Sequence, residues 1–529
     1  MTVEKFVSAA GRSTVYGLFH AQVRRKPSAV AVEFKGATTS FADLDIRVRK
    51  LASLLIKQDV RRGDRVAILS ENRPEYIEAE LACAMTGAIL ACQNWRLTGR
   101  ELQYCISLVA PKILLVSADK INAIRDLSLP DCPVINFDTY YPSLIGTANP
   151  ANANPDVDPE DGMLILYTSG TTGLPKGALI SQRAQIARMC ALRMDVGIRD
   201  QDAFIAWAPM FHMASTDQLL GALMSGSPVA VIDGFQPDAI IDAAERHSLG
   251  WFVMMPGVIE PFIRRLKERK PQLNRIACVG AMADLVPRQE IVDLTALLNA
   301  PYFNSFGSTE TGTPPASAAL IQPGDTQYSL SKRISSVCEV RLVDDHGAEV
   351  PEGAPGELAI RGPTVFSGYW NAPETNAKDF RDGWFHMGDL FRRNPDGTLD
   401  FVDRAKYLIK SGGENIYPAE IERVLLADTR IADAAVVRKK DAQWGEVPVA
   451  FIARNDADLS VADVNDLCRA NLANYKRPKE IHFIPLDDLP RSTTGKIQRH
   501  ELEARLENTD MRTASAPAKP HSDPNGGND

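Results

Sequence analysis

Two stretches near the amino end of the chain place apolar residues at the spacing of an amphipathic helix. They are residues 41–57 (FADLDIRVRKLASLLIK) and residues 74–86 (PEYIEAELACAMT), and Pro74 suits the first turn of the second helix. Short apolar runs at residues 64–70 and 113–117 predict buried strands. This alternation predicts α/β layers with a parallel sheet, and a mixed α+β arrangement is the alternative that the pattern leaves open.

The pattern changes twice further along the chain. Residues 143–160 are rich in Pro, Asn and Ala, which predicts a loop or a link between subdomains. A strand at residues 165–167 then leads into a glycine-rich segment. After about residue 401 the chain carries strand signals of its own, at residues 434–437 and 449–452, over a length that suits a separate small domain.

Length and composition fit this division. The chain has 529 residues, of which 45% are hydrophobic and 24% charged, values that are ordinary for globular proteins. Residues 509–529 lack apolar content and are expected to form a disordered tail. We therefore expect an N-terminal domain over residues 1–405 and a small C-terminal domain over residues 406–508.

Charge and cysteine usage narrow the class of protein. The net charge of −8 argues against general binding to nucleic acid, although it does not exclude a nucleotide site. The eight cysteines are scattered without metal-ligand spacing, which favours reduced thiols in the cytoplasm and no structural zinc. The first residues lack the apolar core of a signal peptide. The longest nearly apolar run, residues 81–92, is too short for an integral membrane segment.

A glycine-rich loop is the strongest local signal for chemistry. In residues 167–177 (YTSGTTGLPKG) glycines allow a close backbone approach, hydroxyls add donors, and a lysine supplies positive charge. The loop is not a Walker A motif, because Lys176 is followed by Gly177. A flexible linker is the alternative, but the ordered pattern next to a strand favours a polyphosphate cradle. The candidate ATP-binding residues here are Thr168, Ser169, Gly170, Thr171, Thr172, Gly173 and Lys176.

This loop resembles the signature of the adenylate-forming superfamily, which includes acyl-CoA synthetases, luciferases and adenylation domains. The resemblance extends from about residue 14 to residue 506, and residues 94–98 (NWRLT) are typical of acyl-CoA and aryl-CoA ligases. It implies an α/β fold with a large N-terminal domain of layered sheets and helices. It also implies a small, mobile C-terminal α+β domain joined to it by a hinge.

Several motifs follow in the order that the resemblance implies. Residues 209–213 (PMFHM) resemble the segment at the carboxylic-acid pocket, with His212 beside the acyl-adenylate. In residues 304–311 (NSFGSTET), Phe306 would stack on adenine, Thr309 would donate to the α-phosphate and Glu310 would bind Mg²⁺. The implied acid pocket comprises His212, Met213, Asp217, Gly280, Gly307 and Gly312. Further implied ATP contacts are Gly280, Ala281, Ser305, Phe306, Gly307, Asp389 and Arg404, of which Asp389 would bind the ribose hydroxyls.

The C-terminal part carries the remaining implied residues. Residues 403–416 (DRAKYLIKSGGENI) resemble the hinge, with Lys406 at the hinge position. Residues 491–497 (RSTTGKI) match the motif of the catalytic lysine, Lys496. With Thr309, Glu310 and His212, this lysine completes the implied catalytic set. The implied CoA-binding residues are Gly412, Gly413, Trp444 and Arg477.

The role of Asp217 is not fixed by the resemblance. Its carboxylate could hydrogen-bond a hydroxyl of the substrate, or it could face a subunit contact. We favour the subunit contact, because an unpaired carboxylate is costly to bury.

The resemblance implies an ATP-dependent carboxylic acid–CoA ligase that needs Mg²⁺. A carboxylate attacks the α-phosphorus of ATP, pyrophosphate leaves, and the CoA thiol then takes the acyl group from the adenylate. The acid is expected to be fatty or aromatic. Three alternatives stay open: an enzyme that loads a separate carrier protein, a non-catalytic acyl- or nucleotide-binding protein, and, more remotely, a luciferase-like oxygenase. A homodimer is a further expectation, because dimers are frequent among relatives.

Overall fold

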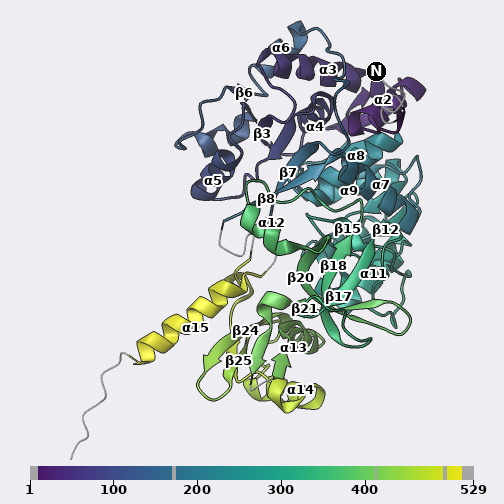
Figure 1. Ribbon diagram of the computed structural model, residues 1–529. Helices are drawn as coiled ribbons and strands as arrows, with labels where there is room; N and C mark the ends of the chain where they lie inside the picture. The colour runs from purple at the N-terminus through teal and green to yellow at the C-terminus, as the bar shows by residue number, and fades with distance from the viewer. Residues whose placement is uncertain (1–6, 8–9, 169–173, 412–413, 492–496, 515–529) are drawn as a thin grey trace, which may run out of the picture. The chain divides into compact units, whose positions relative to one another are not determined.

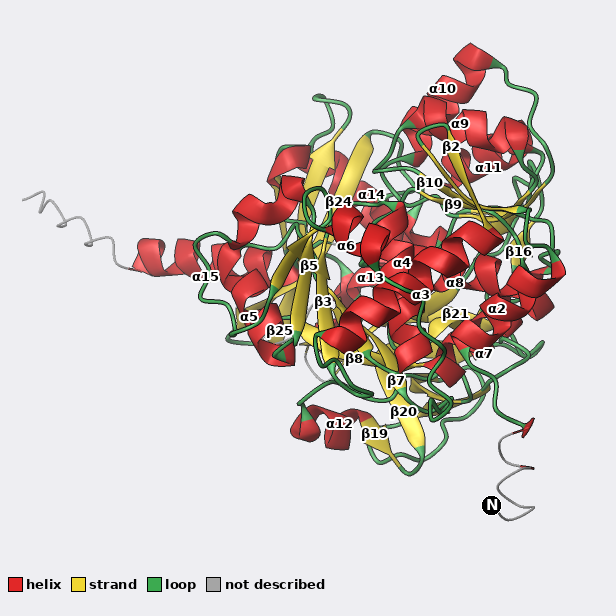
Figure 2. Ribbon diagram, turned by 90° about the horizontal axis from the view of Figure 1, so that it is seen from above, coloured by secondary structure: helices red, strands yellow, loops and turns green. Residues whose placement is uncertain are grey.

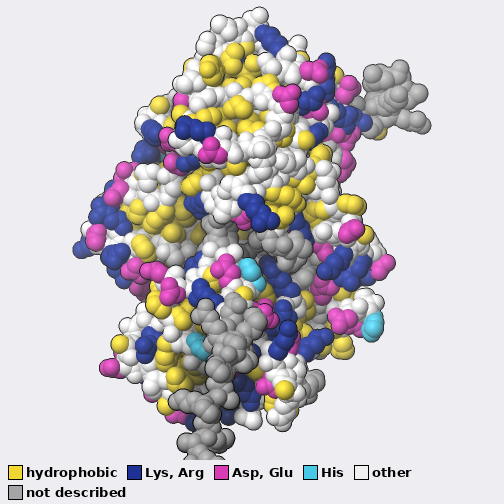
Figure 3. Space-filling view, turned by 90° about the vertical axis from the view of Figure 1, so that its left-hand side faces the viewer, with side chains coloured by type: hydrophobic (Ala, Val, Ile, Leu, Met, Phe, Trp, Pro, Cys, Tyr) yellow, Lys and Arg dark blue, Asp and Glu magenta, His cyan; other side chains and the backbone are white. Residues whose placement is uncertain are grey.

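The chain forms two compact units (Figure 1), which we describe separately. The computed structural model describes residues 7, 10–168, 174–411, 414–491 and 497–514. Unit 1 comprises Met1–Met387 and Phe391–Phe401, and unit 2 comprises Gly388–Leu390 and Val402–Asp529. On the face drawn in Figure 3, basic and acidic side chains are interspersed.

A six-stranded sheet in unit 1 confirms the predicted parallel α/β arrangement. Its strand order is β6-β5-β3-β4-β7-β8, and all neighbours are parallel except β7 and β8. These strands are β3 (Arg65–Leu69), β4 (Ile89–Cys92), β5 (Ile113–Val116), β6 (Val134–Asn136), β7 (Gly162–Thr168) and β8 (Lys176–Ser181). Parallel strands need crossover connections, which here run through helices.

The two helices predicted from apolar spacing are present with the expected bounds. They are α3 (Phe41–Lys57) and α4 (Pro74–Thr86). Figure 2 shows both on one side of β3 and β5 and α5 (Gly99–Val109) on the other. Leu102 and Ile106 of α5 accordingly pack on alternate residues of these strands. Because both faces of the sheet are covered, its inner strands β4 and β5 are apolar and buried throughout.

Unit 1 contains two further mixed sheets, with the orders β2-β1-β10-β9 and β11-β12-β13-β16. Their strands are β1 (Val30–Phe34), β2 (Ala37–Ser40), β9 (Phe204–Ala206), β10 (Val229–Val231), β11 (Leu249–Phe252), β12 (Ile276–Val279), β13 (Tyr302–Phe303) and β16 (Leu320–Ile321). The other helical segments of unit 1 are α2 (Val15–Arg25), η1 (Ala118–Ile124), α6 (Tyr141–Thr147), α7 (Gln182–Val196), α8 (Met213–Ser225), α9 (Pro237–Arg246), α10 (Ile259–Arg269), η2 (Ala283–Leu285), α11 (Arg288–Leu298) and α12 (Pro373–Asp379).

A short hairpin and an antiparallel sheet follow in the chain. The hairpin pairs β14 (Phe306–Ser308) with β15 (Gly312–Ala316). The sheet has the order β17-β18-β20-β19, with β21 beside β20. Its strands are β17 (Glu339–Val343), β18 (Pro355–Arg361), β19 (Phe380–Arg381), β20 (Trp384–Arg393) and β21 (Leu399–Arg404).

Unit 2 has its own sheet and its own apolar core. The strand order is β23-β22-β25-β24, and β26 lies parallel to β25. Ile409, Ile416, Val436 and Ile452 form part of the core. The strands are β22 (Ile409–Ser411), β23 (Glu414–Ile416), β24 (Ile431–Asp441), β25 (Gly445–Arg454) and β26 (Glu480–Phe483). The helical segments are η3 (Ala405–Tyr407), α13 (Pro418–Leu425), α14 (Val461–Asn471), η4 (Asn474–Lys476), η5 (Leu486–Asp488) and α15 (Arg499–Ala514).

Two segments differ from the sequence prediction. Residues 143–147, expected within a loop, belong to α6, because Tyr141 and Ile145 lie one helical turn apart and are both buried. Residues 509–514, assigned to a disordered tail, continue α15, which begins within the packed part of unit 2, where Leu502 and Leu506 are buried. A helix that is already nucleated extends at little further cost. Residues 515–529 lie outside the described part of the chain.

Candidate active site

The glycine-rich loop connects two paired strands. Thr168 ends β7, Lys176 begins β8, and the two residues are register partners. The pairing therefore fixes Lys176 at the base of the loop. The intervening candidates lie outside the described residues; they are Ser169, Gly170, Thr171, Thr172 and Gly173.

Tyr369 connects Lys176 with Glu310. The Nζ atom of Lys176 lies 4.6 Å from the centroid of the Tyr369 ring. The Tyr369 hydroxyl donates a hydrogen bond to Oε1 of Glu310 over 2.8 Å. The loop lysine and the acidic residue of the 304–311 motif therefore come together around one aromatic side chain.

The charges of Lys176 and Glu310 both act on the carboxyl group of Asp379. Burial raises the pKa of its carboxyl group, Lys176 acts in the opposite direction, and Glu310 adds to the rise. Carboxylate oxygens are preferred ligands of Mg²⁺, so Glu310 suits a cation that also binds phosphate oxygens. Within the described residues, no group of three or more His, Cys, Asp and Glu side chains could hold a metal by itself. Sequence reasoning missed Tyr369 and Asp379, because no short motif connects them with Glu310.

A tight hairpin turn presents Thr309 and Glu310. Thr311 closes the turn, since its hydroxyl accepts a hydrogen bond from the Ser308 N–H over 3.1 Å. The Glu310 carbonyl accepts a hydrogen bond from the Phe366 N–H over 2.8 Å. Gly307 passes so close to the Gly312 carbonyl that a side-chain carbon would overlap with it. Packing within the hairpin therefore requires a glycine at position 307, next to Phe306.

Phe306 is fixed by two other aromatic rings. It stacks on Phe401 with a centroid separation of 5.4 Å, and it meets Phe391 edge to face at 4.7 Å. Ser305, the neighbouring candidate, is buried. These contacts leave Phe306 little rotational freedom, which suits a residue that stacks on a planar base.

Gly280 and Ala281 follow β12 and pack against aromatic residues. The Trp251 indole N–H donates a hydrogen bond to the Gly280 carbonyl over 2.6 Å, and the Tyr302 hydroxyl donates to the Ala281 carbonyl over 2.9 Å. Gly280 has a φ of +81°, and a side-chain carbon there would overlap with the Tyr302 ring. Only glycine fits this position.

His212 is the N-cap of α8, next to Met213, the first residue of the helix. Its Nδ1 atom accepts a hydrogen bond from the Ala214 N–H over 3.3 Å. Asn72 holds the preceding segment: its Oδ1 accepts from the Met210 N–H over 2.9 Å, and its amide nitrogen donates to the Ala208 carbonyl over 2.8 Å. The same nitrogen contacts the carbonyls of Ala206, Trp207 and Ile232. Asn72 therefore connects the end of β3 with the segment that leads to His212.

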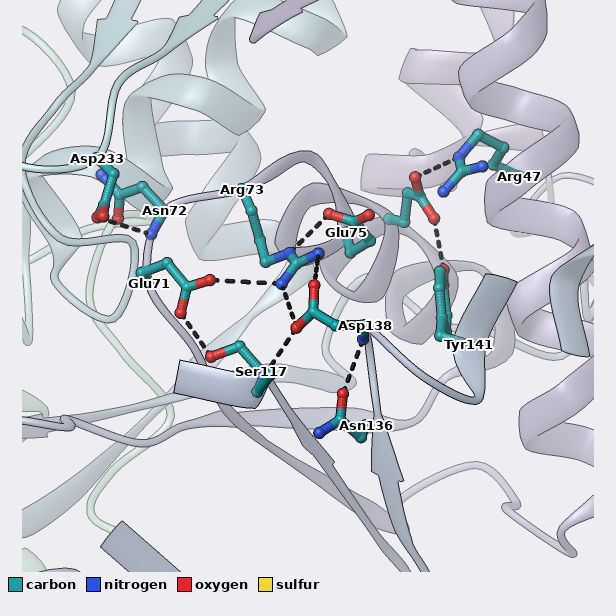
Figure 4. A network of polar contacts seen from close by, with 12 residues as sticks. Arg47, Glu71, Asn72, Arg73, Glu75, Ser117, Asn136, Asp138, Tyr141 and Asp233 are labelled. Carbon is teal, nitrogen blue, oxygen red and sulfur yellow. Dashed lines mark hydrogen bonds and ion pairs between the residues drawn. The ribbon is translucent and has the colours of Figure 1, made fainter. Parts of the chain in front are cut away.

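Arg73 anchors the loop that follows β3 and contains Asn72 (Figure 4). Its guanidinium pairs with Glu71, Glu75 and Asp138, and the Ser117 hydroxyl donates to Glu71 over 2.5 Å. Hydrogen bonding to Arg73 holds the pKa of Asp138 below its ordinary value. These contacts join the loops that follow β3, β5 and β6. Sequence reasoning missed Asn72 and Arg73, although the polar run directly after a buried strand was a usable signal.

Asp217 lies in the interior of unit 1 and pairs with Arg188. The two side chains are each 1% exposed, and the Arg188 Nη1 atom lies 3.2 Å from Oδ2 of Asp217. The favoured expectation of a subunit contact is therefore wrong, because the carboxylate is not on a surface. The carboxylate is paired with an arginine of the same chain. Gly312 is buried as well, and the aliphatic part of Arg188 packs against it.

The candidates of unit 2 lie partly in described segments. Asp389 and Arg404 form an ion pair of 3.0 Å. Lys406 lies in η3, with its Nζ atom 4.7 Å from the centroid of the Tyr407 ring. Trp444 is 44% exposed at the turn between β24 and β25, so it is not a core residue of unit 2. The candidates outside the described residues are Gly412, Gly413 and Lys496.

Arg477 contacts the end of α14. Its Nε atom donates a hydrogen bond to the Leu472 carbonyl over 3.0 Å. Neighbouring Lys476 pairs with Glu420 over 2.7 Å. Arg477, the cation implied to bind CoA, and its neighbour Lys476 therefore both have protein partners in unit 2.

Asp403 is a buried carboxylate directly before Arg404. It accepts hydrogen bonds from the N–H groups of Arg404 over 2.6 Å and of Ala419 over 2.7 Å, and it thereby satisfies an orphan donor at the start of α13. Burial raises its pKa from the ordinary value of 3.8 to about 6, with Glu422 adding to the rise and Arg499 opposing it.

The fold and the site define a nucleotide-using enzyme: a layered α/β unit with a glycine-rich loop, a Thr–Glu turn, and a separate small domain. Residues 19–370 match the family described as AMP-binding enzyme, and residues 420–496 match the AMP-binding enzyme C-terminal domain. The chain belongs to the AMP-binding enzyme family. Among the described residues, no helix has the length and apolar character needed to cross a membrane.

The chain is similar to named CoA ligases over nearly its whole length. It is 35% identical to an indoleacetate–CoA ligase of Aromatoleum aromaticum, with 90% of this chain and 95% of the relative covered. It is 32% identical to a feruloyl-CoA synthase of Amycolatopsis sp., with 92% and 97% covered. The predicted class, an AMP-forming acid–thiol ligase of the acyl-CoA synthetase type, is confirmed.

Solved structures agree with this class. The chain resembles the o-succinylbenzoate CoA synthetase of Bacillus subtilis in complex with the acyl-adenylate intermediate, with a TM-score of 0.82, 26% identity, and 93% and 98% of the two chains covered. A structure of the same enzyme in complex with ATP and magnesium ion gives a TM-score of 0.79 at 26% identity, with 92% and 98% covered.

Proposed function

We propose that this chain activates an aromatic carboxylic acid with ATP and Mg²⁺ and transfers the acyl group to CoA. The observation that carries the assignment of the site is the convergence of Lys176 and Glu310 on Tyr369. A lysine at a glycine-rich loop and a carboxylate beside it provide the two kinds of group that a polyphosphate and its cation require.

The first step joins a carboxylate to the α-phosphorus of ATP, so several negative charges must be held close together. Such a step depends on positioning and charge compensation more than on a protein nucleophile. Lys176 and Lys496 provide positive charge, and Thr309 donates its hydroxyl to the α-phosphate. Mg²⁺ bound by Glu310 would neutralise phosphate charge.

The remaining candidates hold the substrates. Phe306, fixed by Phe391 and Phe401, stacks on the adenine, and Asp389 accepts hydrogen bonds from the ribose hydroxyls. Arg404, paired with Asp389, contacts the nucleotide. Gly280, Ala281, Ser305 and Gly307 border the nucleotide and the acid, and His212 and Met213 lie beside the acyl group.

The second step requires access for the CoA thiol. We assign the hinge between the two half-reactions to Lys406. Exposed Trp444 packs on the pantetheine arm, Gly412 and Gly413 let that arm pass close to the backbone, and Arg477 contacts CoA phosphate. We place the reaction in the cytoplasm, since the eight cysteines are free thiols and a reducing compartment keeps them so.

The aromatic acid is favoured over a fatty acid by the relatives. The names of the indoleacetate, ferulate and o-succinylbenzoate enzymes all specify acids with a ring. Helix α8 follows His212 and consists mainly of small or apolar residues, which suits an uncharged ring. The negative charge of Asp217 does not oppose such a substrate, because Arg188 neutralises it.

The test is acid-dependent release of pyrophosphate from MgATP by the full chain, with and without CoA. The acids are indoleacetate, ferulate, 2-succinylbenzoate, benzoate, acetate and fatty acids of medium and long chain. We expect release and thioester formation with one group of ring acids. A preference for fatty acids would contradict the aromatic assignment. Release without thioester would favour a carrier-protein acceptor, and silence accompanied by ATP binding would favour a binding protein.

A variant separates the two steps. Lys496→Ala should lose pyrophosphate release while it keeps thioester formation from prepared acyl-adenylate. Equal loss of both half-reactions would show that Lys496 does not have the assigned role.

A further inference from the structure

Arg188 is among the largest side chains that are fully buried in the protein. It lies on α7, and its charge is balanced by Asp217 on α8, whose Oδ1 and Oδ2 atoms are 3.4 and 3.2 Å from the Arg188 Nη1 atom. Burying a charged group is costly unless it has a partner. None of the contacts proposed above for the nucleotide or the acid involves Arg188.

The other nitrogens of Arg188 contact the backbone beside the site. Nη2 donates a hydrogen bond to the Thr309 carbonyl over 3.0 Å, and Nε donates to the Thr364 carbonyl over 3.1 Å. Thr309 begins the turn that carries Glu310, and Thr364 lies two residues before Phe366, whose N–H donates to the Glu310 carbonyl. One guanidinium therefore connects the two backbone segments that hold Glu310.

The aliphatic part of Arg188 also shapes the turn. Gly312, which starts β15 at the end of the turn, has a φ of +76°, and a side-chain carbon there would lie 2.8 Å from Cγ and Cδ of Arg188. Arg188 thus contacts the turn at both of its ends. Its planar guanidinium sets the directions of its donors, which a single ammonium group cannot reproduce.

We propose that Arg188 is a positioning residue for acid activation. It fixes the Thr309–Glu310 turn toward the phosphates and the cation, and Asp217 holds Arg188 in place. The inference rests on the proposed function, because it assumes that Thr309 and Glu310 act on MgATP. Misplacement of a catalytic group by about 1 Å can slow a reaction on the order of 100-fold, so this restraint matters for the rate.

The test is Arg188→Lys in the full chain, which keeps a positive charge near Asp217 but loses the directed donors. We expect adenylation to slow by about 10- to 100-fold and the half-saturating Mg²⁺ concentration to rise several-fold. Thioester formation from prepared acyl-adenylate should slow less than adenylation, because the adenylate keeps the α-phosphate that Thr309 contacts but lacks the β- and γ-phosphates and their cation. Arg193→Lys is the matched control, because Arg193 also lies on α7 and pairs with an acid, Asp200, which lies outside the Thr309–Glu310 turn. It should behave as the wild type.

Two further measurements keep the inference testable. Calorimetric binding of MgATP needs no acid, and we expect about tenfold weaker binding in Arg188→Lys and no change in Arg193→Lys. If Arg188→Lys does not fold, Gly312→Ala should give the same signature, because its methyl group displaces Arg188 from the other side.

The outcomes distinguish a failure of the proposed function from a failure of the role proposed for Arg188. If the wild type released no pyrophosphate with any acid, the proposed function would be contradicted. The MgATP affinities of the wild type and Arg188→Lys, measured by calorimetry, would still test the role of Arg188. Unchanged Mg²⁺ dependence and MgATP affinity in Arg188→Lys, with Glu310→Gln impaired, would overturn the inference and leave the proposed function intact. A parallel loss of both half-reactions, tracking thermal stability, would show a purely structural role and would also overturn it.

Discussion

The Tyr369 hydroxyl donates a hydrogen bond to Oε1 of Glu310, although the two residues are 59 positions apart. The Tyr369 ring also lies 4.6 Å from Nζ of Lys176. A single side chain therefore sets the spacing between the loop cation and the proposed cation ligand, and it fixes one carboxylate oxygen of Glu310.

Tyr369→Phe should weaken the use of Mg²⁺. A hydrogen bond to a charged group contributes about 1.5–3 kcal/mol, so we expect the half-saturating Mg²⁺ concentration for pyrophosphate release to rise roughly tenfold. The measurement is a Mg²⁺ titration at saturating ATP. Tyr328→Phe is a matched control, since the buried hydroxyl of Tyr328 has no hydrogen-bond partner among the described residues. If both variants matched the wild type, Tyr369 would not orient Glu310.

Asn72→Ala should destabilise unit 1. The substitution leaves the Met210 N–H and the Ala208 carbonyl without their partner, and we expect a loss of about 3 kcal/mol. Urea unfolding followed by tryptophan fluorescence measures it, because Trp444 alone among the six tryptophans belongs to unit 2. Asn122→Ala, at an exposed position, should leave the midpoint almost unchanged. An equal effect of the two substitutions would refute the connecting role of Asn72.

Asp217→Asn should lower stability without altering the choice of acid. Removing one partner of a buried ion pair costs about 3–5 kcal/mol, because Arg188 then remains charged in the interior. The checks are the urea midpoint and the order of preference across the acid panel. Asp242→Asn, which breaks an ion pair at a half-exposed carboxylate, is the control and should cost less than about 1 kcal/mol. A changed acid preference with unchanged stability would place Asp217 in the substrate pocket after all.

Asp403 should make the stability of unit 2 depend on pH. Its pKa is raised to about 6 in the folded protein, so the folded state binds the proton more tightly than the unfolded state does. The contribution is fully favourable below about pH 4, declines as the pH rises, and is lost above about pH 6, a change of about 3 kcal/mol.

Asp403→Asn removes this titration. The unfolding free energy of the wild type should therefore fall relative to that of the variant as the pH rises from about 4 to about 6. Hydrogen exchange of the Ala419 amide and its neighbours, measured across this range, reports on unit 2. Parallel curves for the two proteins would show that Asp403 has an ordinary pKa.

The sequence pattern alone predicted those features that depend on residues a few positions apart. The bounds of α3 and α4 follow from apolar residues one helical turn apart, with Ser40 and Pro74 at their starts. The apolar runs of β3 and β5 predicted a covered parallel sheet. The motifs around Lys176, Phe306 and Glu310 indicated the chemistry, because glycines, hydroxyls and charges in a fixed order suit few ligands other than a phosphate.

Local pattern failed where a residue's role depends on a distant partner. Asp217 reads as a lone carboxylate in an apolar helix, and only the packing of α7 against α8 supplies Arg188. Tyr369 has no signal near Glu310, and Asn72 contacts the segment before His212 across two sheets. The sequence by itself determined the enzyme class and most local elements, because propensity and motif chemistry act over a few residues. Only the tertiary structure decided which side chains restrain the site, because those contacts form between segments that folding brings together.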